Sequence, residues 1–338
     1  MTITKVKYPI WYDMAFFIPV GEYKILYGGT FIYSGYATSP DETATGVNIY
    51  VKSILMNYLK PDMEVGENGD FAHNTTQTRV FQLWMGTESG PRYEMTVWWD
   101  WSYSQDWFNH LNTSGDLLSR PISTHWNRMQ VIPMTIWDTG EKQNKWMFSY
   151  RTSTGGEGIK IDTLVPSNLF ITVTALPSTV KGMTDFDLSK NNIPLLSWKA
   201  EDEKCGYGSL YYINQFGGWD SYLLENNIVR KQDIDRQEWN TGSNWSSTEF
   251  DYQYITKSIR ETISTNTGWL SDNQSANMYN NLFTSPMIYF QDFSAEEPGH
   301  LYPVNLTKTS WNKKEFKNGR HLISYNLEFK FSHIKQRQ

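Results

Sequence analysis

Short runs in which apolar and polar residues alternate recur along the chain, and this period of two is typical of half-buried β-strands. The longest run is 321–331, in which five apolar or aromatic residues alternate with polar ones: Ile323, Tyr325, Leu327, Phe329 and Phe331. The segment 249–256 alternates in the same way. A helical period is confined to 53–59 and 272–283. The pattern predicts a mainly β fold, with two β-sandwich/barrel-like domains and few short helices.

Glycine pairs predict where some of these strands turn. Gly28-Gly29 separates two apolar runs near the N-terminus, and Gly217-Gly218 separates the two halves of 211–224. Glycine supplies the positive φ that a two-residue hairpin turn requires. We also expect 128–137 and 145–151 to form a hairpin with each other.

The second helical segment carries its own start signal. Ser271 followed by Gln274 is a capping-box pattern, and Pro286 ends the segment. The spacing i, i+3, i+4 places four apolar residues on one face: Met278, Tyr279, Leu282 and Phe283. Further strands are expected over 47–51, 79–85, 93–99, 169–174, 194–200, 287–290 and 301–306.

A glycine-rich stretch, 152–158, predicts a domain boundary. Residues 1–160 would form an N-terminal β-domain with a long aromatic insertion, 100–121. Residues 161–338 would form a C-terminal β-domain that carries the hairpin of 211–224 and one short helix. The polar, charged stretch 225–248 is interpreted as an extended arm rather than core.

Composition narrows the possible functions. The 338 residues include 15 Trp and 21 Tyr, side chains that are enriched at interfaces and sugar sites. One cysteine excludes an intrachain disulfide, and no apolar stretch is long enough for a membrane span. The net charge is −6, although 306–338 holds eight Lys/Arg against two Glu. We interpret that basic segment as a solvated edge strand and tail, and we do not expect direct nucleic-acid binding.

No residue pattern indicates an active site. The acidic candidates for glycoside hydrolysis, Asp100 and the pair Asp185 and Asp187, are interpreted as solvated or turn-capping carboxylates. The histidines are scattered, Asp233 and Asp235 lack the rest of a calcium loop, and Cys205 has no partner set. We therefore expect no enzyme activity, no cofactor and no metal.

Three segments resemble tail-associated structural proteins of Bacteroidetes phages, including the crAss-like phages. They are 18–59, then 212–224 with its Gly-Gly-Trp-Asp, and the closing series from 268 to 332. The resemblance implies a virion subunit that is synthesised in the host cytoplasm and assembles into a ring or hub of the tail. It also implies a ring order that is a multiple of six, and neighbours among other tail or portal-proximal proteins.

The residues expected to mediate assembly are mostly aromatic. They are Phe216, Gly217, Gly218, Trp219, Asp220, Trp239, Trp245, Trp98, Trp99 and Trp101. We expect Asp220 to accept backbone N–H groups in its turn, and the arm 225–248 and the strand 321–331 to take part in assembly. The alternative function is a carbohydrate-binding or receptor-binding tail module, which requires exposed, coplanar indoles among Trp98, Trp99 and Trp101.

Overall fold

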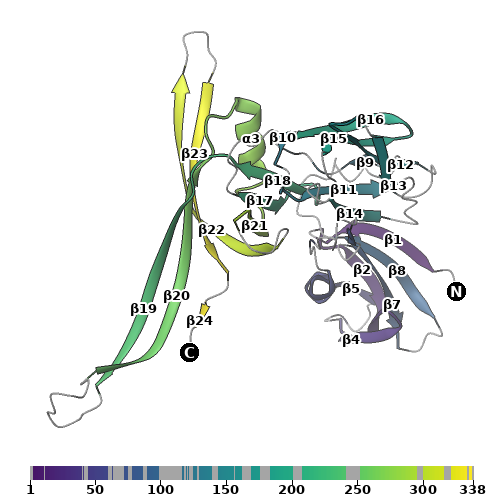
Figure 1. Cartoon of the computed structure of the whole chain (residues 1–338). Coiled ribbons are helices and arrows are strands. Elements are labelled where there is room, and N and C mark those ends of the chain that lie inside the picture. Colours follow the sequence, from purple (N-terminus) through teal and green to yellow (C-terminus); the bar gives the residue numbers. More distant parts are fainter. Residues whose placement is uncertain are drawn as a thin grey trace. The chain divides into compact units, whose positions relative to one another are not determined.

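The structure is a computed structural model. It describes residues 3–10, 12–39, 41, 45–59, 63, 72–74, 78–86, 90–98, 116–117, 119, 121, 125–127, 129–138, 144–155, 157–161, 169–175, 183–200, 208–240, 252–294, 300–315, 321–332 and 335–336. Strands in several sheets dominate this part of the chain, which confirms a mainly β fold (Figure 1). Its helices are short: α1 (Lys52–Leu55), the 3-10 turn η1 (Met56–Tyr58) and α3 (Asp272–Asn280).

The chain forms two compact units, each built from separate stretches. Unit 1 comprises Met1–Arg120, Val131–Ser197 and Asn214–Trp219, and unit 2 comprises Pro121–Gln130, Trp198–Ile213 and Asp220–Gln338. This interleaved division differs from the sequential boundary expected at residue 160. The stretch 152–158 lies inside unit 1, where Gly155 N–H donates to the Thr152 carbonyl in a tight turn.

The first sheet of unit 1 has five strands. In spatial order they are β1 (Thr4–Pro9), β8 (Pro91–Trp98), β7 (Thr78–Met85), β3 (Gly21–Tyr27) and β4 (Thr30–Ala37). Gly28 and Gly29 join β3 to β4 with φ of 56° and 82°, which confirms the predicted two-residue hairpin. Leu55 of α1 shares a core with Ile25 and Phe81.

Three further sheets are formed by strands of the first 200 residues. A two-stranded sheet pairs β2 (Ala15–Pro19) with β5 (Gly46–Tyr50). A four-stranded sheet has the order β6 (Ala72–Asn74), β14 (Leu169–Ala175), β11 (Ile132–Asp138) and β9 (Asp116–Leu117). A five-stranded sheet has the order β10 (His125–Trp126), β16 (Ile193–Ala200), β15 (Met183–Lys190), β12 (Trp146–Thr152) and β13 (Glu157–Ile161).

The hairpin expected between 128–137 and 145–151 is wrong. Both strands exist, but β11 pairs with β14 and β9, whereas β12 pairs with β13 and β15. A further strand, β15, lies between the strands expected over 169–174 and 194–200. Asn191 and Asn192, at φ of 53° and 65°, form the left-handed turn that joins β15 to β16.

The largest sheet has eight strands. Their order is β18 (Trp219–Leu224), β17 (Gly208–Ile213), β21 (Ile288–Asp292), β22 (Leu301–Glu315), β23 (His321–Phe331), β20 (Tyr252–Asn266) and β19 (Val229–Asn240), with β24 (Lys335–Gln336) paired to β20. Its core includes Leu210, Ile263, Phe290, Leu327 and Phe329. The strand β23 lies between β22 and β20, so the prediction of a closing edge strand is wrong for 321–331.

The helix α3 confirms the capping signal. Ser271 Oγ accepts from Gln274 N–H, and Gln274 Oε1 accepts from Ser271 N–H at 3.0 Å. Met278 is buried as expected, but Tyr279 is 61% exposed, so the predicted four-residue apolar face is wrong at that position. The helix lies beside β23 in Figure 1.

Candidate assembly surfaces

The turn between β17 and β18 is built around Asn214. Asn214 Oδ1 accepts from the N–H groups of Phe216 and Gly218, both at 2.9 Å, and the Gly217 N–H donates to the Asn214 carbonyl. Gly217 then adopts φ of 80°. This is a three-residue loop, a type I turn followed by a left-handed glycine, rather than the two-residue Gly-Gly turn. Asn214 provides the acceptor role that we expected from Asp220.

Trp219, which follows the turn, belongs to the protein's own core. Its indole is 0% exposed. Its backbone N–H donates to Thr135 Oγ1 at 2.9 Å, and its carbonyl accepts from Ser119 Oγ at 2.6 Å. Gly217, Gly218 and Asp220 are buried as well, and Phe216 is half-buried. These residues stabilise the fold here and offer little surface to a neighbour.

Two tyrosines beside the turn are held in their neutral form. Tyr212 is fully buried, and desolvation, with the nearby Asp220 and Tyr222, raises the pKa of its hydroxyl well above the ordinary value. Burial likewise raises the pKa of Tyr222, whose hydroxyl donates to the Thr267 carbonyl at 2.9 Å. A buried phenol resists ionisation because the charged form loses its hydration.

The predicted arm takes the form of a two-stranded ribbon. β19 pairs with β20 over its whole length, from the Val229–Ser264 pair to the Asn240–Tyr252 pair. β23 supports β20 only over Thr262–Asn266, and β24 adds two residues. In Figure 1 the ribbon runs away from the rest of its sheet, and its described side chains on β19 are exposed.

One predicted assembly residue lies in this ribbon. Trp239 is in β19 opposite Gln253, but its side chain lies outside the described set. Trp245 lies outside the described residues. The backbone of the ribbon therefore supports an extended arm, while these two tryptophans stay predictions.

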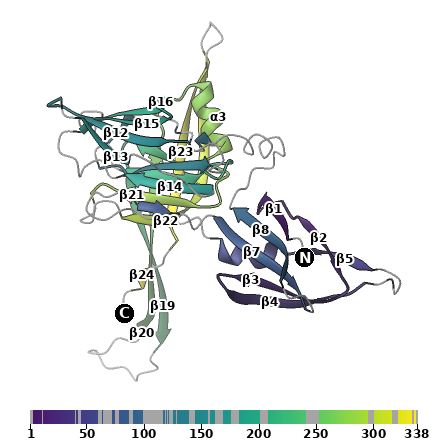
Figure 2. The ribbon, with the colours of Figure 1, turned by 90° about the vertical axis from the view of Figure 1, so that its right-hand side faces the viewer.

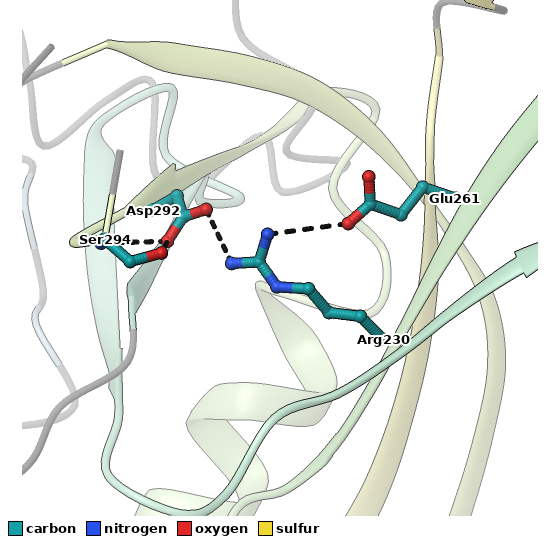
Figure 3. Close-up of polar contacts among 4 residues, drawn as sticks. All are labelled: Arg230, Glu261, Asp292 and Ser294. Atoms are coloured by element: carbon teal, nitrogen blue, oxygen red, sulfur yellow. Dashed lines mark hydrogen bonds and ion pairs between the residues drawn. The ribbon is translucent and has the colours of Figure 1, made fainter. Parts of the chain in front are cut away.

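An arginine anchors the base of the ribbon, as Figure 3 shows. Arg230 at the start of β19 contacts Asp292 at the end of β21, with Nη2 to Oδ2 at 2.5 Å, and Glu261 of β20, with Nη1 to Oε1 at 3.5 Å. Partial burial alone would raise the pKa of the Asp292 carboxyl. The hydrogen bonds from Ser294 and Arg230 outweigh that effect and lower the pKa below its ordinary value.

The sequence signals did not reveal this anchor. Arg230 and Asp292 are 62 positions apart, and each lies in a stretch that is polar for other reasons. They meet because β19 and β21 belong to the same eight-stranded sheet. No local pattern could have joined them.

The tryptophan cluster 98–107 is only partly described. Trp98 ends β8 and is 1% exposed, and its ring centroid lies 4.9 Å from that of Trp137. The alternative of an exposed glycan-stacking indole is therefore wrong for Trp98. Trp99 and Trp101 lie outside the described residues.

A largely polar groove lies on the eight-stranded sheet. Its volume is about 350 Å³, and it is lined mostly by amide, hydroxyl and charged side chains of β20, β22 and β23, with Asn227 and, at the start of β19, Val229. Asn266 Nδ2 donates to Asn326 Oδ1 at 2.6 Å, and Asn326 Nδ2 donates to Ser310 Oγ at 3.3 Å. These amides largely bond to one another, as on an ordinary solvated sheet face.

The acidic candidates do not converge on one site. Asp185 accepts from Thr184 Oγ1, and Asp187 lies 3.7 Å from Arg151, all on or beside β15 and β12. Asp233 is exposed on β19, and its neighbour Asp235 is on the same strand. Asp100 and Cys205 lie outside the described residues. Within the described chain no three His, Cys, Asp or Glu residues are grouped closely enough to hold a metal ion.

Comparison with known proteins adds no family assignment. The sequence matches no protein-family model and no curated protein. Among the described residues, none of the helices combines the length and the hydropathy required to cross a membrane.

Proposed function

We propose that this chain is a structural subunit of the tail of a tailed bacteriophage and that it acts by assembly. Copies would form a ring or hub together with other tail or portal-proximal proteins. The resemblance of 18–59, 212–224 and 268–332 to phage tail proteins supports the phage assignment. The single observation that supports assembly is the ribbon of β19 and β20.

The ribbon favours a partner for an energetic reason. A two-stranded hairpin is marginally stable in water, because each strand buries little apolar surface. From Gln232 to Asn240, β19 pairs only with β20 among the described residues. Contact with a neighbour would supply the missing burial. In a closed ring each subunit uses two different surfaces, and an arm that reaches a neighbour provides one of them.

The proposed ring order, a multiple of six, is based on the resemblance to phage tail proteins. The proposed location in the virion tail has the same basis. The alternative of a carbohydrate-binding tail module has weaker support, because the described member of its tryptophan platform, Trp98, is buried.

Trimming the ribbon tests the proposal. Asp235 and Ser258 are cross-strand partners, so Asn-Gly in place of residues 236–257 joins them by a two-residue turn. We expect negative-stain images and solution mass to show closed rings for the wild type and none for the trimmed chain, with circular dichroism and a thermal melt showing that the trimmed chain is still folded. Tyr279→Ser, on an exposed position of α3, is the matched surface control and should retain rings.

The possible outcomes separate the alternatives. Rings that persist in the trimmed chain would exclude the arm as the assembly element. A wild type that stays monomeric and binds a glycan panel would favour the carbohydrate-binding alternative.

A further inference from the structure

The strands that end a sheet differ in how they are protected. Among the described strands of six residues or more, these are β1, β4, β18 and β19. β19 carries six charged residues, β1 carries two lysines and ends at a proline, and β18 is buried at five of its six positions. Charge, proline and burial each prevent uncontrolled pairing of an edge with another chain.

The strand β4 has none of these protections. Its eight residues, TFIYSGYA, include no charged residue and no proline. Its three aromatic side chains are exposed: Phe31 is 53% exposed, Tyr33 39% and Tyr36 67%. Figure 2 shows β4 at the border of its sheet, beside β3. An edge of this kind is suited to pairing with an added strand.

The inner neighbours of β4 hold its aromatic side chains in place. The rings of Tyr33 and Tyr23 lie 5.9 Å apart between centroids. The Phe31 ring contacts Trp84 edge-on at 6.1 Å, and Lys24 Nζ lies 5.8 Å from its centroid. The edge is therefore ordered before any partner arrives, which lowers the entropy cost of pairing.

The charges nearest to this edge are balanced. On β3, Glu22 lies opposite Tyr36 and Lys24 lies opposite Ser34. The Lys24 and Glu22 side chains pair with each other at 3.2 Å. A partner strand beside β4 would thus meet an uncharged strand whose charged neighbours on β3, Glu22 and Lys24, pair with each other.

We propose that β4 pairs antiparallel with β4 of a second copy of this chain, so that two five-stranded sheets join across a two-fold axis. Like charges placed opposite one another destabilise strand pairs, and a strand without charged residues avoids this cost against its own copy in every register. The pairing would satisfy the outer backbone groups of both strands and cover their exposed rings. Isologous pairing closes at two copies, so it is independent of the ring proposed above.

A charge variant of the edge tests the pairing. Ser34→Lys with Tyr36→Lys places two lysines at exposed positions of β4 and replaces the exposed Tyr36 ring. The matched control, Ile193→Lys with Leu195→Lys, adds the same charge at exposed positions of β16, which lies between β10 and β15 in its sheet. Solution mass of the full-length proteins is measured across a concentration series, with circular dichroism and thermal melts to check folding.

We expect the β4 variant to weaken dimerisation at least about tenfold, because it gathers four lysines on two adjoining edge strands. The β16 control should dimerise as the wild type does. Hydrogen exchange of the wild type gives a second readout without a substitution. Amides of 30–37 should exchange more slowly at high concentration than at low concentration.

Other results would overturn the proposal. The proposal is wrong if the wild type shows no two-fold stoichiometry. It is also wrong if a folded β4 variant dimerises normally, or if the amides of 30–37 are unprotected in the dimer. Open-ended aggregates would also contradict a closed two-fold contact. The arm-trimmed chain should still dimerise, so failure of the ring proposal and failure of this one are distinguishable.

Discussion

Single polar side chains fix the geometry of the β17–β18 turn and of the base of the ribbon. Asn214 organises the turn before β18, and Arg230 joins the base of β19 to β21. Arg230 is 40% exposed at its side chain and Asp292 only 11%. Solvent screens the exposed partner, so the pair stabilises less than a buried ion pair while still defining where the ribbon starts.

Asp292→Asn should loosen the base of the ribbon. The substitution removes a charge-assisted hydrogen bond, and we expect a loss of about 1 kcal/mol in the free energy of unfolding at neutral pH. Hydrogen exchange of 229–234 should become faster. Asp233→Asn is the matched control, because Asp233 is exposed on the same ribbon.

The same pair predicts a pH dependence with a definite sign. The folded pKa of Asp292 is lowered from an ordinary value of 3.8. Its stabilisation is therefore fully present above about pH 3.8 and disappears as the pH falls through the folded pKa. The difference in stability between wild type and Asp292→Asn should shrink below that pH. A difference that stays constant into strong acid would show that the carboxylate charge is not involved.

At the scale of elements, the hairpin β17–β18 depends on one left-handed residue. Gly217 has φ of 80°, so Gly217→Ala should destabilise the protein by about 1–2 kcal/mol. Gly217→Asn should cost less, since asparagine tolerates this conformation. Chemical denaturation measures both. Gly90→Ala is the control, because an added Cβ there meets no atom within 4 Å and the backbone is not left-handed. Equal losses for Ala and Asn would contradict the conformational explanation.

Elements with local signals could be predicted from the sequence. The Gly28-Gly29 hairpin and the Ser271 capping box were correct, because a few adjacent residues determine each of them. The closing strand 321–331 was found by its alternation. Its place inside the sheet was not, because β20 and β22 are selected by long-range packing.

The prediction of strand pairing was wrong where it paired a strand with the nearest apolar run in the sequence. β11 and β12 are neighbours in sequence, yet β14 and β15 compete successfully for them. Alternation shows which face of a strand is buried but not which strand lies beside it. The anchor Arg230–Asp292 and the exposed edge of β4 escaped prediction for this same reason.

At the scale of the whole molecule, the chain passes between its two units at residues 120, 130, 197, 213 and 219. A boundary at 160 would therefore separate strands that pair. In a chain divided at residue 160, the first sheet keeps its core of Ile25, Phe81 and their neighbours. In the same chain β12 loses its partner β15, and β11 loses its partner β14.

A chain truncated after residue 160 should therefore fold only in part. We expect slow hydrogen exchange to persist in the first sheet and to be lost in 146–152. Fluorescence should shift to the red, because Trp137 and Trp146, both buried in the full chain, become exposed. A chain ending at residue 200 restores β14 and β15 and is the matched comparison. If 146–152 stayed protected in the shorter chain, β12 would not need its partner, and the sequential division would be the better description of the fold.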